Sequence, residues 1–420
     1  MTESFSLYLH IPFCTAKCDY CDFYSVPLQR GSSIIDRYIG ILLKETERQF
    51  METERQLETE RRPVDETGSV TVPSIYIGGG TPSLLGAGGI SRLLEGLLDL
   101  LKRSSALSSP GEITVEANPE TADDTFLRSC ADHGVTRLSL GVQSFDPGFR
   151  EFLGRRTGRH VRSGWVNSPG KGVALLRNRI AAAAEIFGSG LCLDLISGGI
   201  YPENGSFEQK RDMLLRDIGA ALSYRPGHVS LYTLTVGEGT PLAARLGKRE
   251  TPPGDQADRL WLAGREALTN AGFEQYEVSN FALQDSAHGN RCIHNIRYWR
   301  MNNWIGVGPG ASGTIIAKDG TGLRRWYAPD TEGFLSGKPV LLTEELDRPT
   351  VIKETLLMGY RYREGPDPEL FARRFGKTIE ETIPRTLKKW QNGMDDAAFR
   401  EKCMLFLNSF LLDAFMELDT

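Results

Sequence analysis

Short runs of apolar residues recur at intervals along the first 240 residues and predict β-strands. The first is "SLYLHI" (6–11), and five others lie within "SIYIGGGTPSLL" (74–85), "GEITVEANPE" (111–120), "VTRLSLGVQSFD" (135–146), "GLCLDLISGGI" (190–200) and "HVSLYTLTV" (228–236). Helical patterns such as "ISRLLEGLLDLLKR" and "QKRDMLLRDIGAALSY" lie between them. Strands that alternate with helices imply parallel βα units, so the sequence predicts an α/β fold.

Polar residues sit at or near the ends of these predicted strands. Gly78–Gly80 and Thr81 follow one strand, Glu116 and Gln143 close two others, and Asp194 lies inside a fourth. In a barrel of parallel strands, functional sites are built at the carboxyl ends. Glycines there let the backbone approach a ligand closely, although an ordinary tight turn would also use them.

Composition restricts the class of protein. The 420 residues are 40% hydrophobic and 25% charged, which suits a globular protein of one to three domains. A net charge of -5 gives no sign of a nucleic-acid-binding surface. The N-terminus "MTESFSLYLH" resembles no signal peptide, and eighteen uncharged apolar residues never occur in a row. We therefore expect a cytoplasmic protein that is not an integral membrane protein and does not bind nucleic acid.

Three of the seven cysteines, Cys14, Cys18 and Cys21, fall within eight positions with C-x3-C-x2-C spacing. An odd number of cysteines in a reducing compartment argues against a disulfide framework and for a metal site. A zinc site is one interpretation, with His10 as a fourth ligand. A cubane iron–sulfur cluster is the other, and three thiolates would leave one iron open to a substrate. The other four cysteines are expected to be buried small side chains.

The cysteine spacing, followed by an aromatic residue, resembles the radical S-adenosylmethionine (SAM) family. The resemblance implies a [4Fe–4S] cluster, SAM as a cofactor and a partial (βα)6 barrel. It also implies roles for individual residues: Tyr8 and Tyr20 beside the cluster, Gly79, Gly80 and Thr81 at the amino group of SAM, and Glu116, Gln143, Arg155 and Asp194 around its ribose, carboxylate or adenine.

Further motifs, including "YLHIPFC", "GGGTPS", "LSLGVQSF" and "LSLYTLT", are similar to the group that contains oxygen-independent coproporphyrinogen III oxidase. That enzyme carries a fourth cysteine where this chain has Phe23. Phe23 and the segment "CIHNIRYW" (292–299) instead resemble the HemW-type heme chaperones. The resemblance implies a protein that binds heme and delivers it to hemoproteins, with respiratory enzymes at the membrane among the candidate clients. The alternative is an enzyme that converts coproporphyrinogen III to protoporphyrinogen IX.

The H-N-x-x-Y-W match implies that His294, Tyr298 and Trp299 bind heme. A neutral imidazole is a common axial ligand of heme iron, and the two aromatic side chains offer flat faces for a porphyrin. A structural histidine beside a core tryptophan is the alternative.

Composition also suggests domain boundaries. We expect the barrel at residues 1–245, a connecting region with the histidine motif at 246–340, and a small helical, winged-helix-like domain at 341–420. A basic insertion at 156–180 is expected to be either a lid over an anionic ligand or a solvated loop. The mixed-charge repeat "ETERQFMETERQLETERR" (45–62) predicts a long solvated helix.

Overall fold

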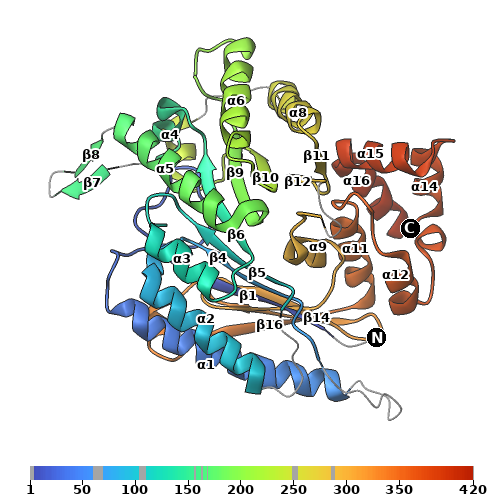
Figure 1. The fold of residues 1–420 in the computed structure, drawn as a ribbon. Helices are drawn as coiled ribbons and strands as arrows, with labels where there is room; N and C mark the ends of the chain where they lie inside the picture. Colours follow the sequence, from blue (N-terminus) through green and yellow to red (C-terminus); the bar gives the residue numbers. More distant parts are fainter. Residues whose placement is uncertain are drawn as a thin grey trace.

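Six parallel strands form the centre of the computed structural model (Figure 1), which describes residues 4–59, 70–103, 110–155, 158–161, 164–167, 169–247, 254–284 and 289–419. These strands lie side by side in the order β10, β9, β6, β5, β4, β1. Their bounds are β1 Ser6–Ile11, β4 Ser74–Gly79, β5 Glu112–Ala117, β6 Arg137–Gln143, β9 Leu191–Ser197 and β10 His228–Thr233. All six were predicted from the sequence, and the α/β class is confirmed.

Helices cover the outer face of these strands. The helices that follow the strands in turn are α1 Ile34–Thr59, α2 Gly86–Arg103, α3 Asp124–Asp132, α4 Pro147–Phe152, α5 Pro169–Phe187, α6 Phe207–Leu222, α7 Pro241–Leu246 and α8 Gly254–Asn270, with short 3-10 turns at Pro82–Leu85 and Gly188–Gly190. The predicted long helix is confirmed as α1 as far as Thr59, and residues 60–62 of the repeat lie outside the described part. It is not fully solvated, because Thr46, Phe50 and Thr53 are buried.

Alternation along the six strands separates two environments. In β4, Ile75 and Ile77 belong to the large apolar core under the helices, whereas Ser74 and Tyr76 make polar contacts with neighbouring strands. Successive side chains of a strand point to opposite faces, so the second set faces the inside of the barrel. The interior is consequently lined by hydroxyl, carboxyl, imidazole and thiol groups, in contrast to the branched apolar side chains that usually fill closed (βα)8 barrels.

The remaining strands extend the sheet at both edges. β12 Asn280–Leu283 pairs antiparallel with β10 and is followed outward by β11 Phe273–Gln275. At the other edge, β13 Trp304–Val307 pairs parallel with β1, and β14 Ser312–Ile316, β15 Gly322–Tyr327 and β16 Leu341–Leu346 continue antiparallel. Two small ribbons stand apart: β2 Phe13–Cys14 with β3 Val26–Pro27, and β7 Gly158–Val161 with β8 Gly164–Asn167.

The C-terminal region is helical, as predicted. It comprises α11 Arg348–Gly359, α12 Pro368–Phe375, α13 Ile379–Thr382, α14 Pro384–Gln391, α15 Asp396–Leu405 and α16 Leu407–Leu418. These helices share a second apolar core that includes Phe371, Phe375 and Phe410. They lie beside the short helix α9 Ile293–Trp299 (Figure 1), while α10 Thr331–Leu335 packs near α1. The described helices include none long and apolar enough to cross a membrane.

The basic insertion contributes the β7–β8 ribbon and the start of α5, and the ribbon projects from the body of the molecule (Figure 1). Residues 156, 157, 162, 163 and 168 within it lie outside the described residues. Its role as a lid or a loop stays a prediction, as do the two boundaries between the three predicted domains.

Candidate functional site

The three clustered cysteines lie on one loop immediately after β1. Pairing of β2 with β3 closes this loop, with Cys14 opposite Pro27, and Leu28 N–H donates to the Cys14 carbonyl at 2.8 Å. All three thiols are free and half-buried. Burial raises the pKa of the Cys21 thiol to about 11. A strand end followed by a tight ribbon therefore brings three thiols together at the carboxyl end of the barrel.

These thiols line one side of a cavity of about 470 Å³. Most of the other predicted cofactor residues line the same cavity: Tyr20, Gly79, Gly80, Thr81, Glu116, Gln143, Arg155 and Asp194. Tyr20 belongs to the cysteine loop, and the others come from β4, β5, β6 and β9 and the segments that follow them. Parallel strands bring their carboxyl ends to the same edge, which is why residues so far apart in sequence meet here.

The glycines allow a close approach of backbone segments. Gly79 has a φ of +110°, a conformation that side chains with a Cβ rarely adopt. A Cβ on Gly80 would lie 2.7 Å from the Phe13 carbonyl oxygen and 3.1 Å from Cys14 Sγ. The next residue, Thr81, places its Oγ1 3.3 Å from Cys14 Sγ. The glycine strand end is thus packed directly against the cysteine loop, which an ordinary turn does not require.

Glu116 has a half-buried side chain that bridges two parts of β4. Its Oε1 accepts a hydrogen bond from Tyr76 Oη at 2.8 Å, and its Oε2 accepts one from Gly79 N–H at 3.0 Å. Burial raises the pKa of Glu116 to about 7, against the opposing effect of the Tyr76 hydrogen bond. The carboxyl group can therefore change protonation near neutral pH and fixes the peptide at Gly79.

Arg155 brings buried donors without partners to the cavity. Its Nη2 donates to Tyr20 Oη at 3.3 Å, but Nε and Nη1 are buried and have no hydrogen-bond partner among the described residues. Buried guanidinium donors are normally paired, so these two atoms fit an anionic group of a bound ligand. The two atoms lie on different edges of the guanidinium plane, so each can donate separately to a polar or anionic group.

Asp194 and Gln143 also line the cavity. Ser139 Oγ lies 3.1 and 2.9 Å from the two Asp194 oxygens, and burial raises the pKa of Asp194. Gln143 has a φ of +66°, at an irregularity in the pairing of β6 with β9. A non-glycine residue in this conformation is strained, and such strain is concentrated at functional sites.

Tyr8 and His10 lie inside the barrel next to the cavity, and neither lines it. Tyr8 Oη is 3.0 Å from His10 Nδ1, and His10 Nε2 is 3.0 Å from the Tyr24 carbonyl oxygen. Both ring nitrogens of His10 are therefore engaged, which removes it as the fourth ligand of a zinc site. Tyr8 thus sits deeper in the barrel than the cysteines.

Asn118, which with Glu116 ends its predicted strand, also lines the cavity. Several cavity residues were not singled out from the sequence: Ser139 in β6, and Tyr232, Thr233 and Thr235 at the end of β10. Ser139 is two residues before Gly141 and four before Gln143, so strand alternation could have placed it on the same face. The end of β10 gave a weaker signal, because hydroxyl side chains are common in strands.

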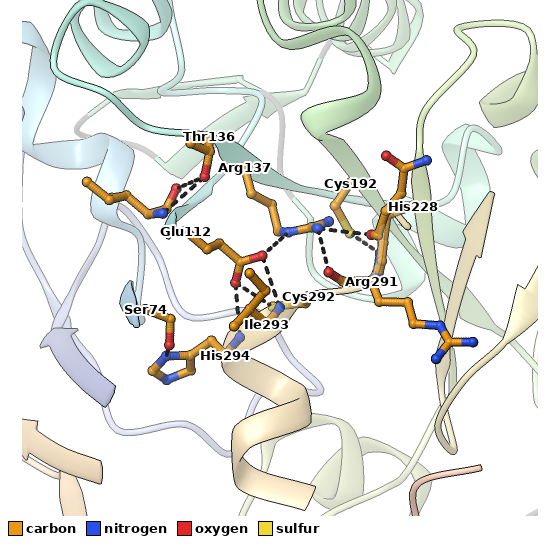
Figure 2. Close-up of polar contacts among 12 residues, drawn as sticks. Ser74, Glu112, Thr136, Arg137, Cys192, His228, Arg291, Cys292, Ile293 and His294 are labelled. Carbon is orange, nitrogen blue, oxygen red and sulfur yellow. Dashed lines mark hydrogen bonds and ion pairs between the residues drawn. The ribbon is translucent and has the colours of Figure 1, made fainter. Parts of the chain in front are cut away.

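The histidine motif lies at the opposite end of the barrel, where the strands begin. Its residues form α9, and Figure 2 shows His294 next to Ser74 and Glu112, the first residues of β4 and β5. The His294 side chain is 1% exposed, with Nδ1 3.0 Å from Ser74 Oγ and the ring 5.1 Å from that of Tyr76. Burial lowers the pKa of His294 to about 3. The motif is thus separated from the cysteines by the depth of the barrel.

The other two motif residues stabilise the same packing. Tyr298 contacts the His294 ring edge-on at a centroid distance of 4.7 Å and contacts Trp304 at 5.0 Å. Trp299 packs against the small apolar cluster of Tyr276 and Tyr362, and its Nε1 is buried without a hydrogen-bond partner.

A buried ion pair holds α9 in place (Figure 2). Glu112 accepts hydrogen bonds from the backbone N–H groups of Ile293 and His294, both at 3.0 Å, and from Arg137 Nε at 3.0 Å. Arg137 Nη2 also donates to the Asn290 and Arg291 carbonyl oxygens. Glu112 and Arg137 were missed because each is the first residue of its strand, away from the carboxyl ends that sequence reasoning examined.

Comparison with known proteins agrees with this geometry. A family profile described as the radical SAM superfamily matches residues 8–163. The heme chaperone HemW of Mycobacterium tuberculosis is 34% identical over 375 residues, which cover 86% of this chain and 83% of that protein. The chain belongs to the HemW family of radical SAM proteins. HemW of Escherichia coli is 33% identical over 79% of this chain and 76% of its own length. Coproporphyrinogen III oxidase (HemN) from Escherichia coli, a radical SAM enzyme, has the same fold, with a TM-score of 0.68 and 17% identity over 96% of this chain and 90% of its own.

Membership of the radical SAM superfamily implies a [4Fe–4S] cluster and SAM as cofactors of this HemW-family chain. The cavity fits them: three free thiols meet a glycine segment on which a Cβ would collide, and the guanidinium of Arg155 has two buried donors without partners. In the described residues no three His, Cys, Asp or Glu side chains are close enough together for a single metal ion. A cubane does not need such convergence, because each thiolate binds a different iron.

Proposed function

We propose that this protein is a heme chaperone of the radical SAM type, which binds heme in the cytoplasm and delivers it to hemoproteins, membrane-bound ones among them. The observation that carries the proposal is the 33–34% identity with HemW heme chaperones over more than three quarters of both chains. Phe23 supports it, because this residue stands where the related oxidase carries a further cysteine. The chain offers an iron–sulfur and SAM cavity at one end of the barrel and an imidazole with two aromatic side chains at the other.

In this proposal Cys14, Cys18 and Cys21 each bind one iron of the cluster. The bound cluster supplies an open iron that chelates SAM and an electron for its sulfonium. The chain's own residues bind and orient the cofactor. The backbone from Gly79 to Thr81 offers donors and acceptors close to the thiols. Nε and Nη1 of Arg155, which have no partner among the described residues, can each donate to an anionic group of the cofactor. Glu116, Gln143 and Asp194 provide acceptors for hydroxyl and amino groups, with Tyr20 and Tyr8 nearby.

Heme binding by His294, Tyr298 and Trp299 is the second part of the proposal. Since His294 is 1% exposed, iron can reach its Nε2 only if α9 moves away from β4 and β5. In the described part of the chain that buried Nε2 atom has no hydrogen-bond partner, which leaves it available as a ligand once exposed. In the buried state the pKa of about 3 keeps the imidazole neutral, and after exposure it returns toward about 6.5.

The test is a heme titration of protein reconstituted anaerobically with iron and sulfide, followed by transfer of the bound heme to apomyoglobin. We expect a Soret band that shifts in His294→Ala, while the iron–sulfur absorbance is unchanged because the cysteines lie at the other end of the barrel. If α9 opens, heme affinity should rise between pH 5.5 and 7.5, because the exposed imidazole must be neutral to bind iron. Heme that binds but never reaches the acceptor would refute delivery. An unaltered spectrum in His294→Ala would make this histidine structural.

The alternative function is that of a coproporphyrinogen III oxidase. Phe23 is 65% exposed and lines the cavity, at the position where the enzyme has its additional cysteine. We expect the reconstituted protein with SAM not to convert coproporphyrinogen III to protoporphyrinogen IX. Steady turnover of this substrate would reverse the assignment.

A further inference from the structure

Tyr76 occupies the middle of β4, between the cofactor cavity and the histidine motif. Its hydroxyl donates to Glu116 Oε1 at 2.8 Å, and Glu116 Oε2 accepts from Gly79 N–H at 3.0 Å. Gly79 and Glu116 both line the cavity. A ligand that contacts Gly79 or Glu116 therefore acts on Tyr76 through the hydrogen bonds of the Glu116 carboxyl group.

The other side of Tyr76 faces α9. Its ring lies 5.1 Å from the His294 ring at an interplanar angle of 34°. Two residues earlier in β4, Ser74 Oγ lies 3.0 Å from His294 Nδ1. Ser74 and Tyr76 of β4 thus contact His294 in addition to the hydrogen bond that Glu112 of β5 accepts from its backbone. Of these residues, Tyr76 is the one that also contacts Glu116.

Tyr76 and Glu116 are half-buried and His294 is buried, and they are in direct contact, so a shift of one affects the next. A Cβ on Gly78 would lie 2.9 Å from Tyr76 Cε1 and 3.0 Å from the Glu116 carboxyl group, so the backbone at Gly78 packs closely against both side chains. Packed interiors pass from one discrete arrangement to another instead of deforming gradually. A change that fixes or frees Glu116 must therefore be felt at the Tyr76 ring and at His294.

We propose that Tyr76 is a positioning residue that couples the cofactor cavity to α9, so that SAM binding stabilises the buried position of His294. The inference rests on the proposed function in one respect, namely that SAM occupies the cavity. Ordering of Gly79 and Glu116 by SAM holds the Tyr76 hydroxyl, and the held ring keeps its contact with His294. Coupling between two sites is reciprocal, so release of α9 weakens SAM binding by the same factor.

The experiment is hydrogen exchange of the peptide that contains Ile293–Trp299, measured by mass spectrometry on anaerobically reconstituted protein with and without saturating SAM. In the wild-type protein we expect SAM to slow exchange of these amides at least about fivefold, the lower end of typical couplings between sites. In Tyr76→Phe, which keeps the ring and removes the hydroxyl, the effect of SAM should fall below about twofold while SAM still binds, as measured by calorimetry. Tyr327→Phe is the control. It removes the hydroxyl of another buried tyrosine, which lies in β15, away from Tyr76, and donates to Glu45 of α1.

Two results would overturn the inference: exchange of α9 that does not respond to SAM in the wild-type protein, or a response that persists unchanged in Tyr76→Phe. The comparison of wild-type protein with and without SAM needs no variant. It can therefore refute the inference even if Tyr76→Phe fails to fold. Heme plays no part in the measurement. A protein that shows the coupling and does not bind heme would therefore refute the chaperone proposal alone, and one that binds heme without any response of α9 to SAM would refute this inference alone.

Discussion

Replacement of Glu112 by Gln tests whether the buried ion pair holds α9 to the barrel. Glu112 and Arg137 side chains are 4% and 9% exposed, and the carboxylate also accepts the N–H groups of Ile293 and His294. Removing one charge of a buried pair leaves the other without compensation, at a cost of about 3–5 kcal/mol. This is a large fraction of the about 5–15 kcal/mol that stabilises a typical protein.

The assay is urea denaturation of Glu112→Gln, Arg137→Met and the double variant. Each single change should lower the free energy of unfolding by about 3–5 kcal/mol, and the double variant by clearly less than the sum, because neither charge is then left unpaired. Asp99→Asn is the control: its ion pair with Lys102, at 3.8 Å, is exposed, and its loss should cost less than about 0.5 kcal/mol. A loss below about 1 kcal/mol for Glu112→Gln, or strict additivity in the double variant, would show that the pair does not hold α9.

Three further predictions concern the cofactor loop, the glycine segment and a buried carboxyl group. Cys18→Ala should lose the visible iron–sulfur absorbance after reconstitution, and stoichiometric zinc in protein purified without oxygen would contradict the cluster assignment. Gly80→Ala should weaken SAM binding measured by calorimetry at least about tenfold, because the added Cβ would lie 2.7 Å from the Phe13 carbonyl oxygen. An unchanged Kd would mean that the backbone at Gly80 can shift to accommodate the methyl group without affecting SAM. Burial raises the pKa of Glu277 from 4.5 to about 8. Between these two pH values the folded state keeps a proton that the unfolded state has released, so the free energy of unfolding falls as the pH rises from about 4.5 to about 8. Glu277→Gln should accordingly raise Tm more at pH 8.5 than at pH 5, and an equal change at both would refute the shift.

The barrel strands and most of the cavity could be predicted from the sequence because both depend on local signals. Each strand is a short apolar run bounded by turn residues, and parallel connection then brings Glu116, Gln143 and Asp194 to one edge without further information. The cysteine spacing is similarly local, and the structure places all three thiols beside the glycine segment.

Long-range features could not be predicted in this way. β13 has only four residues, Trp304–Val307, followed by glycine, and nothing local indicates that it pairs with β1. The sequence of the histidine motif shows which residue types it contains but not at which end of the barrel α9 lies. That place depends on the ion pair of Glu112 and Arg137, which are 25 residues apart in sequence. Tyr8 faces the inside of the barrel, where it meets His10, and its depth depends on the tilt of the strand.

The place of β1 in the sheet has a consequence for synthesis of the chain. β1 pairs with β4 on one side and with β13 on the other, and Ser6 is opposite Trp304. At about 5–20 residues per second, a ribosome needs roughly 15–60 s to go from the first of these residues to the second. During that time β1 has an unpaired edge on the side that β13 later occupies. The thiols of the cysteine loop that follows β1 are already outside the ribosome. The loop is therefore exposed to iron and sulfide donors, and to oxidants, well before the segment that completes the sheet exists.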